Sequence, residues 1–193
     1  MSLITDLLYP KSNYDLTTSK IKSVVKLDGF DGVLSLFSYH PPIKDIISDI
    51  KYNFVTDIIP DLVNYSATQL INYFPNLLSY WQENNFVLVP VPLHEFRQNW
   101  RGFNQSELIG QPLASSLNLQ FCNLLTRTFI SPSQVSLSDK LLRHQNKSNF
   151  TLNFSPPKNV ILFDDVITTG STMKSITSIF PKTTCLWALS IAG

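Results

Sequence analysis

The stretch Val160–Thr172, which reads VILFDDVITTGST, constrains the fold more than any other part of the chain. Its first four residues are apolar, as is typical of a strand buried inside a parallel sheet. Two acidic residues follow, then a run of small or hydroxylated residues, and then Ser171–Phe180, which has the pattern of a helix. A strand that leads through such a loop into a helix predicts an α/β unit, and ligands of α/β sheets bind outside the carboxyl ends of the strands.

The loop predicts a phosphate site beside two carboxylates. Free N–H groups and the positive dipole end of the following helix favour an anion, and Gly170 lets the backbone approach a phosphate closely. The expected phosphate-binding residues are Thr168, Thr169, Gly170, Ser171 and Thr172. A ribose 5-phosphate suits such a site, because its 2′ and 3′ hydroxyls can donate to Asp164 and Asp165. A bare pair of acids also ends ordinary strands, and Thr-Gly-Ser also caps ordinary helices, so the prediction depends on the whole ordered string.

Strands and helices alternate along the rest of the chain, which predicts a parallel α/β sheet flanked by helices. Apolar runs predict further strands at Val33–Tyr39, Phe86–Val91, Phe121–Leu125 and Thr184–Ala192. Helical spacing of apolar residues predicts helices at Ile43–Tyr52, Leu62–Phe74 and Asn104–Asn118. The sequence predicts an N-terminal cap, residues 1–85, followed by the sheet domain, residues 86–193.

Local sequence features predict a helix cap, a proline inside the same helix and a long loop. Asn104 and Glu107 have the spacing of a capping box at the start of their helix. Pro112 lies inside the same helix and is expected to bend or shorten it. The polar stretch Ser131–Asn149 has no clear period and predicts a long loop, of the kind that often forms a functional lid.

Val89–Glu107, which reads VPVPLHEFRQNWRGFNQSE, resembles the PVPL…R…RGFNQ…L signature of the competence-protein ComF family. Val160–Thr172 in turn resembles the ribose-phosphate fingerprint of the type I phosphoribosyltransferases, to which that family is related. Ile43–Tyr52 resembles the family's IxxxK[FY] helix, with Lys51 at the lysine. Purine-salvage members have an acidic residue at the place of Thr168, so the resemblance argues against a purine-salvage enzyme.

The resemblance implies a type I phosphoribosyltransferase-like α/β fold with a small N-terminal cap, and a site for 5-phosphoribosyl-1-pyrophosphate (PRPP) with Mg²⁺. The ligand is expected to carry the Mg²⁺, and no protein residue is assigned to the metal. Arg97, Arg101 and Lys147 are expected to bind the pyrophosphate, since departing negative charge needs basic side chains. Arg101 and Arg143 are the expected catalytic residues, with Arg143 and Lys147 on the predicted lid.

Composition excludes several other classes of protein. Only 15% of the 193 residues are charged and the net charge is +1, so we expect no strong direct binding to nucleic acid. No apolar run approaches the length of a membrane span, and Met1–Pro10 lacks the pattern of a signal peptide. A cytoplasmic location is therefore expected.

The sequence is compatible with two functional classes. The first is a phosphoribosyltransferase that acts on an unidentified acceptor. The second is a non-catalytic PRPP-binding regulator, or an accessory protein of DNA uptake with a partner in the competence machinery. Both carboxylates and the complete loop favour ligand binding in either class.

The N-terminal segment predicts a protein without a structural zinc ion. Relatives in the ComF family usually begin with a zinc module that carries CxxC pairs, whereas Leu3–Tyr14 has no cysteine, and the chain has only Cys122 and Cys185. A closed zinc site needs four ligands, commonly cysteines. We therefore expect elemental analysis of the purified protein to find no stoichiometric zinc. One tightly held zinc per chain would contradict this interpretation of the N-terminal segment.

Overall fold

A computed structural model describes residues 15–16, 19, 25, 27–93, 99–127 and 149–193 of the chain. A five-stranded parallel sheet lies at its centre, in the order β1-β7-β6-β2-β3. Its strands are β1 (Gly32–Phe37), β2 (Val87–Pro90), β3 (Gln120–Phe121), β6 (Asn159–Val166) and β7 (Cys185–Ala192). A separate antiparallel pair consists of β4 (Leu125–Arg127) and β5 (Phe150–Leu152). The predicted parallel α/β sheet is thus confirmed.

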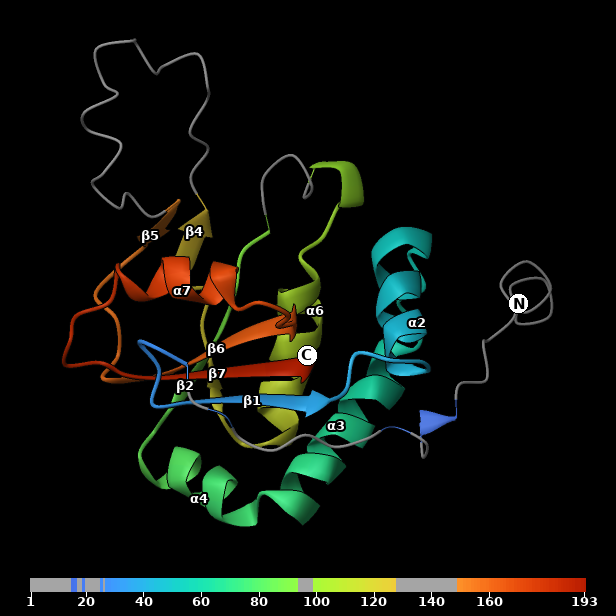
Figure 1. Ribbon diagram of the computed structural model, residues 1–193, viewed down its shortest axis with the longest axis horizontal. Helices are drawn as coiled ribbons and strands as arrows, with labels where there is room; N and C mark the ends of the chain where they lie inside the picture. Colours follow the sequence, from blue (N-terminus) through green and yellow to red (C-terminus); the bar gives the residue numbers. More distant parts are fainter. Residues whose placement is uncertain (1–14, 17–18, 20–24, 26, 94–98, 128–148) are drawn as a thin grey trace, which may run out of the picture.

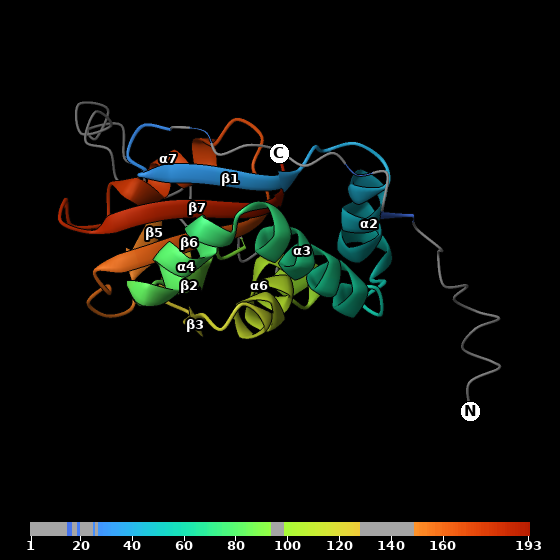
Figure 2. The same ribbon diagram turned by 90° about the horizontal axis from the view of Figure 1, so that it is seen from below.

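Helices cover both faces of the sheet, and α7 lies on the face opposite to α3 and α4 (Figures 1 and 2). The helices are α2 (Ile43–Ser48), η2 (Asp49–Asn53), α3 (Ile59–Tyr73), α4 (Pro75–Glu83), α6 (Gln105–Ser116) and α7 (Ser171–Thr177). One apolar core joins α2, α3, α4 and α6 to the sheet, and a second joins α7, β4 and β5 to its other face. In the part of the chain that the structure describes, no helix has the length and hydropathy of a membrane span.

The ends of several elements differ from the sequence prediction. β6 continues to Val166, so both aspartates lie within the strand and not after it. The predicted strand Phe121–Leu125 is divided, since β3 ends at Phe121 and Leu125 begins β4. The last helix ends at Thr177 and not at Phe180. Most of the predicted lid, residues 131–148, lies outside the described residues.

The start of α6 also differs from the expectation. Asn104 caps the helix by accepting a hydrogen bond from the Ser106 N–H at 3.2 Å, but Glu107 does not complete a capping box. Its carboxylate instead accepts from the Asn123 side chain at 2.7 Å. The helix continues through Pro112 to Ser116, so the proline does not shorten it. Pro112 lies on the exposed side of the helix, where a carbonyl left without its N–H partner can bond to water.

The first 85 residues supply β1 to the same sheet as the strands that follow. The expected boundary near residue 85 falls between α4 and β2 and stays a prediction. β1 is buried along its whole length, and its backbone also pairs with Val25 through two 2.9 Å hydrogen bonds to Val33.

The fold places α6 against the sheet at a glycine. A Cβ atom on Gly110 would lie 2.8 Å from the Phe163 ring and 3.2 Å from a Leu88 methyl group. Glycine therefore sets how closely α6 approaches β2 and β6.

We expect Gly110→Ala to lower the free energy of unfolding by about 1–3 kcal/mol, as overpacking of a well-packed core does. Urea denaturation measures the change. Ser115→Ala is a matched control in the same helix, because Ser115 is exposed and alanine has the higher helix propensity. A Gly110→Ala protein as stable as the control would show that α6 can move away from Phe163 at no cost.

Candidate functional site

The candidate site lies at the carboxyl end of β6, where the chain turns into α7 (Figure 1). A pocket is formed there by one carboxylate and the loop that follows it. Its lining residues are Asp164, Val166, Ile167, Thr168, Thr169, Gly170, Ser171, Thr172 and Met173. The structure therefore brings all five residues of the predicted phosphate loop together with Asp164.

The shape of this loop depends on glycine and on hydroxyl contacts. Gly170 has φ +69°, in the left-handed region that favours glycine, and a Cβ atom there would lie 3.0 Å from a Leu27 methyl group. The Thr169 hydroxyl lies 3.2 Å from the Ser171 hydroxyl and accepts a 3.4 Å hydrogen bond from the Ser171 N–H. Because α7 has only seven residues, its dipole is a modest contribution. Anion binding would depend mainly on the N–H and hydroxyl groups of the loop.

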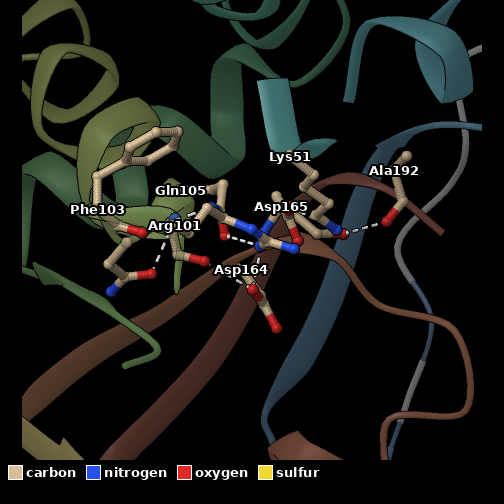
Figure 3. Close-up of polar contacts among 10 residues, drawn as sticks. Lys51, Arg101, Phe103, Gln105, Asp164, Asp165 and Ala192 are labelled. Carbon is tan, nitrogen blue, oxygen red and sulfur yellow. Dashed lines mark hydrogen bonds and ion pairs between the residues drawn. The ribbon is translucent and has the colours of Figure 1, made fainter. Parts of the chain in front are cut away.

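Asp165 is the more deeply buried of the two aspartates, and it forms an ion pair with Lys51. The Lys51 ammonium nitrogen lies 2.7 Å from Asp165 Oδ2, and the two side chains are 19% and 8% exposed. Lys51 comes from η2, a π-helical turn far from β6 in the sequence. Figure 3 shows its side chain reaching across to Asp165 at the end of the strands.

Asp164 has different partners. Its Oδ1 accepts a 2.7 Å hydrogen bond from the Ser106 hydroxyl at the start of α6 and a 2.9 Å bond from the Asp165 N–H. Burial and the neighbouring Asp165 carboxylate raise the pKa of Asp164 to about 7, although the Ser106 bond and the Lys51 charge act in the opposite direction. The Asp164 carboxylate, which lines the pocket, is therefore costly to ionise near neutral pH.

Arg101 is only 6% exposed and lies between aromatic rings. Its guanidinium carbon is 5.3 Å from the centre of the Tyr52 ring and 5.8 Å from that of Trp100. One terminal nitrogen donates a 2.6 Å hydrogen bond to Gln105 Oε1, while Nε is buried without a hydrogen-bond partner. Among the residues that the structure describes, no carboxylate pairs with this guanidinium.

Several expected site residues lie outside the described residues. These are Arg97, Arg143 and Lys147, and their assignments stay predictions. Arg127, at the end of β4, is described, and its guanidinium lies 5.0 Å from the centre of the Phe150 ring. Within the described ranges, no group of three or more His, Cys, Asp or Glu side chains is arranged to hold a metal ion.

Comparison with known proteins gives several relatives. Over 100 residues, 49% of this chain and 44% of the relative, the chain is 40% identical to "Competence protein F" of Haemophilus influenzae. It is 30% identical over 146 residues to "DNA utilization protein YhgH" of Escherichia coli K12, covering 75% of this chain and 63% of that protein. The chain belongs to the ComF family.

A third ComF relative is "Competence protein ComFC" of Bacillus subtilis, 28% identical over 141 residues, or 72% of this chain and 53% of that protein. The matched region is therefore less than two thirds of the length of each of these three relatives, and less than half of the first. No protein-family model matches the chain.

Three residues that contact the predicted site residues were not predicted from the sequence. Lys51, Gln105 and Ser106 contact Asp165, Arg101 and Asp164, respectively. Each lies in a segment that resembles a ComF signature, Lys51 in the IxxxK[FY] helix and the other two in RGFNQSE. The signal was therefore present, but the sequence does not show which carboxylate each residue faces.

The raised pKa of Asp164 makes the stability of the fold depend on pH. In the unfolded chain the pKa of this carboxyl group is about 4. In the folded chain burial and the Asp165 carboxylate raise the pKa to about 7. Rising pH across this interval therefore favours the unfolded state. We expect the free energy of unfolding of the wild type to fall between these pH values relative to that of Asp164→Asn.

Urea denaturation of both proteins at several pH values measures this difference. Asp57→Asn is the matched control, because it removes an exposed carboxylate elsewhere and should follow the wild type. If the curves for wild type and Asp164→Asn ran parallel, Asp164 would not have the raised pKa.

Proposed function

We propose that this chain binds PRPP with Mg²⁺ and transfers the phosphoribosyl group to an acceptor that the sequence does not identify. The ribose 5-phosphate would lie at the end of β6. Its phosphate would bind the loop at Thr168–Thr172, and its hydroxyls would donate to Asp164 and Asp165. The parallel sheet flanked by helices supports a type I phosphoribosyltransferase-like fold.

One observation carries this proposal, namely that Asp164 lines the same pocket as all five residues of the phosphate loop. A carboxylate repels a bare phosphate, so a pocket that combines the two suits a ligand with both an anionic group and hydroxyl donors. A sugar phosphate has both.

Arg101 supports the placement of the pyrophosphate. A buried cation is costly unless an anion or a set of hydrogen bonds compensates it. Arg101 has the Gln105 oxygen and two aromatic faces, but no carboxylate among the described residues. Arg101 bonds to Gln105 at the start of α6, and the next residue, Ser106, bonds to Asp164. Arg101 therefore lies near the proposed ribose site. A pyrophosphate attached to that ribose could supply the missing negative charge.

In the proposed reaction, the bond between C1′ of the ribose and the pyrophosphate oxygen breaks, and the pyrophosphate leaves with the electron pair. The acceptor atom forms the new bond to C1′ and releases its proton. Bound Mg²⁺ would neutralise charge on the departing pyrophosphate. Asp164 and Asp165 would fix the ribose, and Arg101 would stabilise the developing negative charge together with Arg143.

The alternative is a non-catalytic PRPP-binding regulator or an accessory protein of DNA uptake. The names of the relatives, competence proteins and DNA utilization proteins, favour a role in DNA uptake or use, which is compatible with either class. Release of pyrophosphate from PRPP, assayed against a panel of amines and bases, separates an enzyme from a binding protein.

The proposal predicts that the wild type binds ribose 5-phosphate, and PRPP in the presence of Mg²⁺. Hydrogen bonds to charged groups contribute about 1.5–3 kcal/mol each, so Asp164→Asn combined with Asp165→Asn should weaken ribose 5-phosphate binding at least about tenfold. Calorimetry measures the affinity, and circular dichroism checks the fold.

The control is Asp57→Asn, which removes one negative charge at an exposed position and should leave the affinity unchanged. Wild-type affinity in the folded double variant would reject the assigned role of the two aspartates.

A further inference from the structure

Lys51 is mostly buried and forms an ion pair with Asp165. Its neighbour Ile50 is fully buried in the core, which fixes η2 against the sheet. The turn is further held by the Asn53 side chain, which donates a 2.7 Å hydrogen bond to Asp49, and by the left-handed Phe54 that ends it. Lys51 is therefore presented to β6 by a rigid support.

The ion pair between Lys51 and Asp165 is largely buried, unlike a surface salt bridge. Exposed ion pairs contribute little, but removal of one partner of a buried pair leaves the other charge uncompensated. The ammonium lies 2.7 Å from Asp165 Oδ2, and Asp165 directly follows Asp164, which lines the ligand pocket. One cation thus acts on two adjacent carboxylates.

The groups around Asp164 can be named element by element. Asp165 comes from β6, Lys51 from η2 and the Ser106 hydroxyl from α6. Arg101 precedes α6 and bonds to Gln105. The loop residues and Met173 that line the pocket carry no titratable side chain. Among these groups, Lys51 is the cation whose charge lowers the pKa of Asp164.

We propose that Lys51 is a positioning residue of the ribose-phosphate site, which holds Asp165 in place beside Asp164 by a direct ion pair. This inference rests on the proposed function, because it assumes that the two carboxylates accept hydrogen bonds from ligand hydroxyls. Lys51 need not touch the ligand. It orients one carboxylate and reduces the repulsion between the two.

The proposal has a consequence for pH dependence that a purely structural role lacks. The Lys51 charge lowers the pKa of Asp164, against burial and the Asp165 carboxylate. Without that charge, Asp164 remains protonated to a higher pH and accepts hydroxyl hydrogen bonds less well. The pH at which ligand binding is half-maximal should therefore move upward when Lys51 is neutralised.

The experiment is calorimetric titration of ribose 5-phosphate into the full chain, across a pH series on both sides of neutrality. Lys51→Met keeps most of the apolar stem and removes the charge. Lys51→Gln also removes it but leaves a donor for Asp165, so that the carboxylate is not left bare. Lys51→Arg restores the charge. Lys44→Met is the matched control, since Lys44 lies on α2 and is exposed.

We expect both neutral variants to bind about tenfold or more weakly at neutral pH, as loss of a charged interaction does, and to reach half-maximal binding at higher pH. Lys51→Arg and Lys44→Met should resemble the wild type. Thermal denaturation identifies the folded variants.

Unchanged affinity and an unchanged pH profile in a folded neutral variant would overturn the inference, even if that variant were less stable, and would leave the proposed function intact. Failure of the wild type to bind ribose 5-phosphate would instead overturn the proposed function, and this inference with it.

Discussion

Two carboxylates at consecutive positions of a buried parallel strand are the constraint on which the site depends. Successive side chains of a strand point in different directions, so Asp164 and Asp165 cannot share one set of partners. Asp165 pairs with Lys51 of η2 (Figure 3). Asp164 bonds to Ser106 of α6 and lines a pocket with the loop before α7. Three segments far apart in the sequence are thus drawn to one end of β6, which is where α/β sheets bind their ligands.

Local features of the site could be predicted from the sequence, whereas its long-range contacts could not. The loop Thr168–Thr172 and the glycine with positive φ follow from the types and order of adjacent residues. The Lys51–Asp165 pair joins residues over a hundred positions apart, and no periodicity indicates it. The length of β6 was underestimated for a related reason, because acidic residues are rare in strands but pairing of Asp164 with Ser190 of β7 continues the ladder past Phe163.

Buried polar groups at the site oppose the stability of the fold. Asp164 is costly to ionise at neutral pH, and Arg101 is buried without a carboxylate partner among the described residues. Buried charged groups of this kind contribute little to stability, since apolar residues of similar volume could replace them in a core. They are typical of functional sites. A hydroxyl donor beside Asp164 and an anion beside Arg101 would compensate both, and a phosphorylated sugar with a second anionic group has that combination of chemistry.

The position of β1 has a consequence for how the molecule can be divided. β1 comes early in the chain, yet it covers β7, an eight-residue strand that is largely buried. A fragment that began after α4 would lose Lys51 and would also leave the N–H and C=O groups along one side of β7 without partners. Open, apolar sheet edges of this kind recruit strands from other molecules. A shortened chain would therefore tend towards self-association.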